Sequence, residues 1–291
     1  MAKYTMDDLM HLMSRLRDPD KGCPWDLKQT TKTLIQHSVE EVYELVDAIE
    51  SDNTKDIQSE LGDVLFQVVF LARLAEENQQ FDFAMVVDQL CEKLIRRHPH
   101  VFIEGQLYNS NQQESLGTSI SERQVSESWE DIKAAERVIE GREGIFDDVP
   151  LALPALLRAV KLQKRAATVG LDFIQARSAL DKLKEEVTEL EQAMDNYQQQ
   201  PDISDSAQSH DYKAVIDELG DVLFSSVNVA RKLAINPESS LRAANRKFSE
   251  RVLAVLAKLS AENSMNGKND DQMTPDPALL AQLWQAVKRE S

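Results

Sequence analysis

Hydrophobic residues recur every three or four positions along most of the chain, and short polar segments separate these periodic stretches. This spacing places the apolar side chains on one face of an α-helix. Glycine and proline, at 9 each, lie mostly between the periodic stretches, where they end helices. The alternation that is typical of strands is scarce. The pattern therefore predicts an all-α protein.

The pattern also repeats within the chain. Glu-Leu-Gly-Asp-Val-Leu-Phe at 60–66 recurs unchanged at 218–224, which is 158 positions later. Three more pairs of similar blocks keep the same order along the chain: 39–45 with 184–190, 72–73 with 230–231, and 129–133 with 284–288. Because chance similarity would not preserve the order of four blocks, we predict two tandem homologous helical-bundle domains.

The N-terminal domain is predicted at 1–140 and the C-terminal domain at 145–291. Glycine and proline interrupt the helical pattern between 141 and 154. The offset between copies rises from 145 to 158, so the second copy has thirteen more residues between its acidic helices. They fall in the polar segment 195–213, which we predict to be a surface loop, as we do for 105–126 and 263–277.

Composition and charge narrow the function classes. The net charge of −17 argues against binding a nucleic-acid polymer, which requires basic residues to neutralise phosphates. The longest apolar stretch is too short to cross a membrane, and the first residues lack the apolar region of an export signal. Two cysteines, Cys23 and Cys91, cannot build a disulfide framework. We therefore expect a cytoplasmic protein that binds no membrane.

The second copy carries four acidic residues in two pairs. Glu186 and Glu189 are three positions apart, as are Glu218 and Asp221, so each pair shares one helix face. Two antiparallel helices could face all four carboxylates into one pocket, where like charges raise one another's pKa or recruit cations. Oxygen ligands without His or Cys favour Mg²⁺, with Mn²⁺ as an alternative. The first copy repeats the pattern at Glu41, Glu44, Glu60 and Asp63.

Two other interpretations of these acidic residues were weighed. A single Glu-x-x-Glu is most often a solvated helix face, but two pairs repeated in two domains argue against that interpretation. A di-iron helical bundle would use Glu-x-x-His on paired helices. Here Asp63 and Asp221 stand where histidine would be, and His210 lies in the polar loop.

Several short motifs are specific in combination. They are Gly-Cys-Pro-Trp-Asp at 22–26, Glu-Glu-Val-Tyr-Glu at 40–44, Glu-Leu-Gly-Asp at 60–63, Arg-Arg-His-Pro-His-Val-Phe at 96–102, Val-Gly-Leu-Asp-Phe at 169–173 and Trp-Gln-Ala-Val-Lys at 284–288. Together they resemble the MazG family of nucleoside triphosphate pyrophosphohydrolases, in the all-α NTP pyrophosphatase superfamily, over nearly the whole chain.

The resemblance implies a fold, an activity and an assembly. It implies tandem helical bundles, a homodimer and Mg²⁺. It also implies cleavage of NTP or dNTP substrates, ATP among them, at the α-phosphorus to NMP and pyrophosphate. Such an enzyme would act in the nucleotide pool or in a stress response. The family further implies that the second domain carries the main activity.

Carried onto this chain, the resemblance assigns metal binding to the second acidic set. The nucleotide contacts fall on Lys182, Glu185, Asp217, Lys247, Arg251 and Trp284. Lys182 lies four positions before Glu186 and can reach phosphate oxygens. The Trp284 ring offers a flat face to a base. Glu185 and Glu186 are the candidates for the catalytic base that accepts a proton from water.

Each of these residues also has a structural interpretation. Trp284 lies beside Leu280 and Leu283 and could be a core residue. Lys247 and Arg251 could be solvated helix cations. The question stays open at the level of sequence.

The two copies differ in their cations. At the offset of 145, Lys182 corresponds to His37, and a provisional alignment pairs Arg251 with Val101. The first domain keeps its acidic residues but loses two cations that could bind phosphate. We therefore predict that it binds metal and hydrolyses nucleotides weakly or not at all.

Two competing functions were considered. One is a non-catalytic helical dimer that binds nucleotides or a partner such as a small GTPase. The other is a metal-dependent nuclease, which the acidic charge disfavours.

Overall fold

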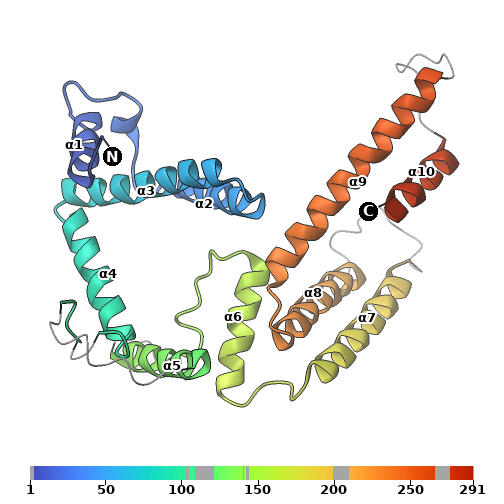
Figure 1. Cartoon of the computed structure of the whole chain (residues 1–291). Coiled ribbons are helices and arrows are strands. Elements are labelled where there is room, and N and C mark those ends of the chain that lie inside the picture. The colour runs from blue at the N-terminus through green and yellow to red at the C-terminus, as the bar shows by residue number, and fades with distance from the viewer. Residues whose placement is uncertain are drawn as a thin grey trace. The chain divides into compact units, whose positions relative to one another are not determined.

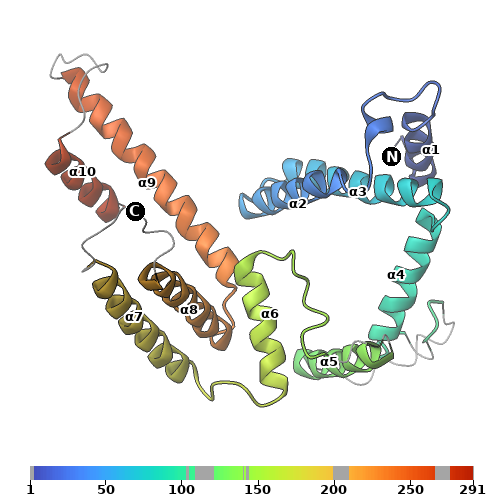
Figure 2. The same cartoon turned by 180° about the vertical axis from the view of Figure 1, so that it is seen from behind.

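The computed structural model describes residues 3–102, 105–108, 121–139, 141, 144–198, 210–265 and 276–290. Every regular element in these ranges is a helix, which confirms the predicted all-α class (Figure 1, Figure 2). The chain divides into two compact units, Met1–Lys133 and Ala134–Ser291. The division falls within α5 (Glu122–Ile139), before the predicted junction at 141–154.

Unit 1 is built around a pair of long helices, α2 and α3, which a short turn connects. Its elements are α1 (Met6–Leu16), η1 (Asp26–Lys28), α2 (Leu34–Glu50), α3 (Thr54–Glu77), α4 (Phe83–Arg97) and the first part of α5. Side chains cap three of these helices, since Thr5, Asn53 and Asp82 accept hydrogen bonds from backbone amides in the first turns of α1, α3 and α4. The core consists of Met13, Leu34, Val69, Phe70 and Leu74.

Unit 2 repeats the long helix pair as α7 and α8. Its other elements are the end of α5, α6 (Ala155–Thr168), α7 (Ala176–Gln198), α8 (His210–Lys232), α9 (Pro237–Met265) and α10 (Pro277–Glu290). Helix α6 packs on α8, whereas α9 packs mainly on α10. The α9/α10 pair has its own apolar cluster, which consists of Val255, Leu259, Leu283 and Val287.

The two long helix pairs match position by position. Val69 in α3 and Val227 in α8, which are 158 positions apart, are 0% and 1% exposed. The polar residues Gln67 and Ser225, at the same offset, are also buried. The repeat in sequence is therefore a repeat in packing.

The predicted loops were too long. Helices α7 and α8 extend into both ends of 195–213, and the middle, 199–209, lies outside the described residues. Similarly, α5 begins at Glu122 and α9 continues to Met265. Polar composition alone does not end a helix, because solvent-exposed turns of a helix are also polar.

Candidate active site

Helices α7 and α8 bring three acidic side chains together. Glu186, near the middle of α7, and Glu218 and Asp221, on α8, have carboxylate oxygens that all lie within 4.8 Å of one another. Glu186 is only 7% exposed, while Asp221 reaches solvent. The cluster therefore has one buried wall and one open side.

Glu189 adjoins this cluster from the next turn of α7. A hydrogen bond with the carboxyl group of Glu186 raises the pKa of Glu189, and desolvation and the charge of Glu218 raise it further. All four predicted ligands thus interact at one place.

One cation faces the cluster from within the same helix. Lys182 Nζ lies 2.7 Å from Glu185 Oε1 and 3.0 Å from Glu186 Oε1. These two hydrogen bonds raise the pKa of Lys182 above its ordinary value, so the group stays charged. A single lysine does not neutralise this many carboxylates, and the site retains a net negative charge.

Unit 1 contains the corresponding cluster. Carboxylate oxygens of Glu41, Glu44 and Glu60 lie within 4.8 Å of one another. Desolvation raises the pKa of Glu41, and the charges of Asp63 and Glu44 add to the effect. Desolvation and the same two neighbours also raise the pKa of Glu60. Both acidic sets are therefore assembled in space, as their spacing in the sequence predicted.

The donor set fits a hard divalent cation. The grouped ligands in both units are carboxylates, and no histidine or cysteine belongs to either group among the described residues. Carboxylate oxygens are preferred by Mg²⁺ and Mn²⁺. Desolvation is the largest cause of the raised pKa values of Glu41 and Glu60, and the hydrogen bond with Glu186 is the largest for Glu189; the charges of neighbouring carboxylates add a repulsion that a bound cation would relieve.

The cation next to the acidic cluster differs between the units. In unit 1 the position of Lys182 holds His37, whose Nδ1 lies 3.5 Å from Glu40 Oε2 and whose ring contacts Trp25 edge-on at 5.7 Å. A histidine at this position carries a full charge only when protonated, whereas a lysine is charged at neutral pH. Unit 1 thus has a weaker cation beside an otherwise equivalent cluster.

The remaining predicted nucleotide contacts lie on different elements. Asp217 is exposed on α8 beside Glu218, and Glu185 is exposed on α7. Lys247 and Arg251 lie on α9, which packs mainly on α10. Trp284, on α10, contacts the apolar cluster of the α9/α10 pair, with its ring centroid 5.7 Å from that of Phe248. The sequence left open whether Trp284 is a core residue, and the structure shows that it packs against the apolar cluster of α9 and α10.

A cavity in unit 2 was not predicted from the sequence. Residues of α6, the segment 170–173 and α8 line a space of about 540 Å³. Arg231 on α8 pairs with Asp172 in this segment. Both residues belong to blocks that the sequence had singled out, the 169–173 motif and the repeated Ala-Arg pair, but nothing in their spacing indicated a cavity.

Fold and site together define an all-α protein with two acidic helix pairs suited to divalent metal. The family model of the MazG nucleotide pyrophosphohydrolase domain matches residues 29–102 and 175–255, which include both clusters. The chain belongs to the MazG nucleotide pyrophosphohydrolase family.

Relatives are similar over much of the chain. A nucleoside triphosphate pyrophosphohydrolase of Escherichia coli (strain K12) is 38% identical over 285 residues, which cover 98% of this chain and 97% of that protein. The nucleoside triphosphate pyrophosphohydrolase/pyrophosphatase MazG of Thermotoga maritima is 40% identical over 250 residues, or 86% of this chain and 85% of the relative. A nucleoside triphosphate pyrophosphohydrolase of Mycobacterium tuberculosis is 37% identical over 166 residues, or 56% of this chain and 45% of its own length.

Proposed function

We propose that this protein hydrolyses nucleoside triphosphates, NTP or dNTP, at the α-phosphorus to NMP and pyrophosphate in the presence of Mg²⁺. The observation that carries the proposal is the carboxylate cluster of Glu186, Glu218 and Asp221 with Lys182 beside it. The names of the relatives support the same reaction.

In this mechanism the chain's residues bind the metal and the phosphates. Glu186, Glu189, Glu218 and Asp221 would hold Mg²⁺, which, when bound, would neutralise phosphate charge and lower the pKa of a water molecule. Lys182 leaves its carboxylate partners to donate to a phosphate oxygen, since a charge-assisted bond to phosphate is at least as strong.

The bond changes are those of a simple hydrolysis. Water oxygen bonds to the α-phosphorus, the bond from that phosphorus to the β-phosphate oxygen breaks, and pyrophosphate leaves with the electron pair. A carboxylate accepts the water proton. Glu185, which is exposed and one residue from the cluster, and Glu186 are the two candidates for this base.

A product assay tests the reaction. Wild-type protein with Mg²⁺ is expected to release pyrophosphate rather than orthophosphate from ATP and the other NTP and dNTP substrates. Glu186→Gln keeps the size of the side chain and removes its charge, and we expect turnover to fall by about 100-fold or more. Pyrophosphate release that is unchanged in a folded Glu186→Gln protein would contradict the proposal.

The alternative is a non-catalytic protein that binds nucleotides or a partner such as a small GTPase. Under that alternative, NTP binds in the presence of Mg²⁺ but no pyrophosphate appears. The same assay therefore separates the two functions.

We propose that the protein acts in the nucleotide pool or in a stress response. We also propose that it works in the cytoplasm, because the free thiols of Cys23 and Cys91 are suited to a reducing compartment. No helix in the described part of the chain is both long and apolar enough to cross a membrane.

We also propose that two copies of the chain associate through the long helix pairs. Ile35, Val39, Val42 and Ile49 recur on one face of α2 at helical spacing and are 48–63% exposed. One face of α8 likewise carries exposed apolar side chains at helical spacing, namely Ile216, Leu219 and Leu223, which are 48–52% exposed.

Two-helix hairpins cannot bury both faces by themselves, and a two-fold axis would join each hairpin to its own copy in a four-helix bundle. Light scattering is expected to give twice the chain mass. Ile216→Glu with Leu219→Glu should shift the mass toward that of one chain. A monomeric wild type would contradict the assembly.

A further inference from the structure

A buried polar residue follows the last aspartate of each acidic helix pair by one helical turn. It is Gln67 after Asp63 on α3 and Ser225 after Asp221 on α8, four positions later in both cases. Residues four apart share a helix face, so each polar side chain lies on the same face as its aspartate. Gln67 is 7% exposed and Ser225 is 8% exposed. The two units thus place different polar groups at the same buried position next to equivalent clusters.

In unit 1 the amide of Gln67 contacts the acidic cluster. Desolvation is the main cause that raises the pKa of Glu41, and a hydrogen bond from the Gln67 side chain opposes that rise. An amide lowers the pKa of a carboxyl group by donating to its charged form, so Nε2 of Gln67 faces Glu41. Gln67 therefore holds a carboxylate that belongs to the predicted metal site.

A residue of α2 fixes the orientation of this amide. Ser38 Oγ lies 2.9 Å from the backbone oxygen of Leu34 and 3.4 Å from Gln67 Oε1. The hydroxyl is thus placed to donate on the side of Oε1. The reversed amide would bring Oε1 against the carboxylate of Glu41, where two acceptors repel each other. Glu41 is therefore oriented by the protein before any cation binds.

Unit 2 has neither member of this polar pair. At the offsets of the repeat, Leu183 replaces Ser38 and Ser225 replaces Gln67. The Glu186 carboxylate is contacted from its own helix, by Lys182 Nζ at 3.0 Å and by a hydrogen bond with Glu189. Its orientation therefore depends on two groups that themselves belong to the proposed reaction site.

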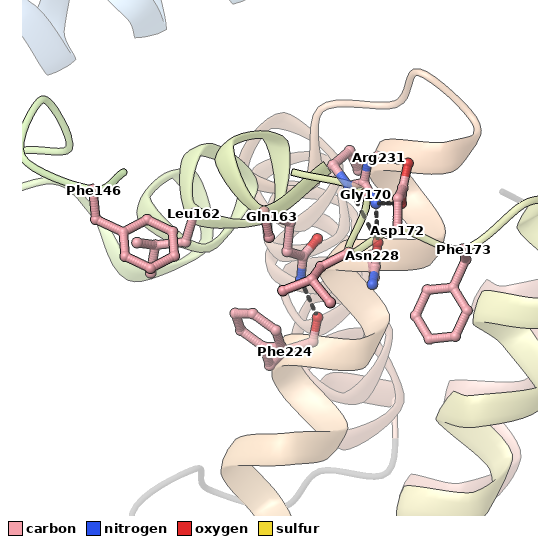
Figure 3. Close-up of a pocket in the computed structure, with 11 residues that line it drawn as sticks. Phe146, Leu162, Gln163, Gly170, Asp172, Phe173, Phe224, Asn228 and Arg231 are labelled. Atoms are coloured by element: carbon pink, nitrogen blue, oxygen red, sulfur yellow. Dashed lines mark hydrogen bonds and ion pairs between the residues drawn. The ribbon is translucent and has the colours of Figure 1, made fainter. Parts of the chain in front are cut away.

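Helix α8 is anchored on its other side at this point. Gln163 on α6 donates from Nε2 to the backbone oxygen of Phe224 at 2.9 Å, and Arg231 Nη2 donates to Asn228 Oδ1 at 2.6 Å (Figure 3). The first bond ties the segment that carries Ser225 to α6. The difference between the units therefore comes from the side chain at this position.

The two arrangements should respond differently to a divalent cation. Hydrogen bonds from the surrounding protein orient a metal ligand, and their loss commonly costs about 10- to 100-fold in metal affinity. Glu41 has such a bond. Glu186 must first give up its contacts with Lys182 and Glu189, which compete with a cation for the same carboxylate. A triphosphate would take over Lys182, so that cation and nucleotide would bind unit 2 together.

We propose that Gln67 is a positioning residue that makes the unit 1 cluster a resident site for Mg²⁺ or Mn²⁺, filled in the absence of nucleotide. Unit 2, with Ser225 at the same position, takes up its cation together with the nucleoside triphosphate. The statement on unit 2 rests on the proposed pyrophosphohydrolase function, whereas the statement on Gln67 does not.

A Mn²⁺ titration of the metal-free full chain, followed by electron paramagnetic resonance without nucleotide, tests the role of Gln67. The wild type is expected to show a tighter and a weaker class of sites, and Glu41→Gln should remove the tighter one. Gln67→Leu keeps most of the side-chain volume, removes the donor and should weaken the tighter class about tenfold or more. An unchanged tighter class in Gln67→Leu would overturn the proposal, as would a tighter class that Glu186→Gln removes instead.

Urea unfolding of the metal-free protein separates positioning from a structural role. Gln67→Leu and Gln67→Met, which also lacks a donor, should unfold at the wild-type midpoint while their Mn²⁺ affinity is lowered. If the affinity fell only in a variant with a lowered midpoint, packing rather than the hydrogen bond would explain the loss, and the proposal would fail.

The reciprocal exchange in unit 2 tests the same position by a gain of affinity. Leu183→Ser with Ser225→Gln introduces both residues of the first copy and should tighten the weaker class about tenfold without nucleotide. Leu183→Ser alone supplies no amide and is the control, which should not tighten it. A double variant that keeps the wild-type affinity of the weaker class would contradict the assignment.

A nucleotide analogue keeps the two statements of the proposal apart. The non-hydrolysable α,β-methylene ATP should tighten the weaker class of Mn²⁺ sites and leave the tighter class unchanged, and the opposite result would contradict the proposal. If the wild-type protein released no pyrophosphate, the proposed function would fail. The titrations without nucleotide would still decide the role of Gln67.

Discussion

The α2/α3 pair and the α7/α8 pair have the same acidic residues but different surroundings. Both assemble at least three carboxylates within 4.8 Å of one another. In α7/α8 the cluster faces Lys182, whereas in α2/α3 the matching residue is His37. Seven residues after Asp221, α8 has Asn228, which lines a cavity. Seven residues after Asp63, α3 has Phe70, which is buried in the core.

Under the proposed function, metal binding and substrate binding are separable properties of this helix pair. The carboxylates come from i, i+3 spacing within each helix, which both copies keep. The cation that would hold a triphosphate comes from another position, which has diverged: it is Lys182 in one pair and His37 in the other. A repeated motif therefore does not imply a repeated activity.

The largest expected effect is a difference in unfolding free energy between matched substitutions in the two helix pairs. Phe70→Ala should lower the unfolding free energy of unit 1 by about 3–5 kcal/mol, because a fully buried ring leaves a cavity in the core. Asn228→Ala removes a half-buried side chain beside an existing cavity and should cost less than about 1.5 kcal/mol. Urea unfolding of the full chain measures both. Equal costs would mean that unit 2 is as closely packed there as unit 1.

A smaller effect is expected for the cation beside the cluster. Lys182→Gln should lower kcat/KM for pyrophosphate release about 10- to 100-fold, since a charge-assisted contact to phosphate is lost. His37→Gln, at the matching position, is the control and should change kcat/KM less than about twofold. If the two substitutions had the same effect, the lysine would not distinguish the units.

The smallest effect concerns the ion pairs that join the 170–173 segment to α8. Hydrogen bonds from Arg231 and Lys232 lower the pKa of Asp172 to about 2 from 3.8, and the side chain is 25% exposed. A lowered pKa contributes stability above pH 4 that is lost as the pH falls through 2. After allowance for solvent screening the contribution is about 1 kcal/mol.

Unfolding of unit 2 should therefore become easier between pH 4 and pH 2, and Asp172→Asn should flatten that dependence. In unit 1, Arg73 occupies the position that matches Arg231, and it pairs instead with Glu76 and Glu77 on its own helix. Asp172→Asn should leave the acid unfolding of unit 1 unchanged. Identical pH profiles for the variant and the wild type would contradict the role of the ion pairs.

Much of this structure follows from the sequence for identifiable reasons. The helices follow from apolar periodicity, and the acidic clusters follow from i, i+3 spacing on two helices that pack against each other in each unit. Helix ends were less accurate, because α7 and α8 continue into polar residues whose side chains simply face solvent.

The cavity could not be predicted in this way. It depends on how α6 packs on α8, and on amide orientations that Phe224 and Arg231 impose. Trp284 illustrates the same limit. Its sequence neighbours fit both a stacking platform and a core residue, and only packing shows that its ring contacts the α9/α10 cluster.

The most direct test of the central claim measures metal binding and turnover together in two matched variants of the full chain. Glu41→Gln and Glu186→Gln each remove one charge from one cluster. We predict that each lowers the number of bound Mn²⁺ ions, counted by electron paramagnetic resonance, while only Glu186→Gln abolishes pyrophosphate release. Loss of turnover with Glu41→Gln to the same extent would contradict the separation of metal binding from catalysis in the two units.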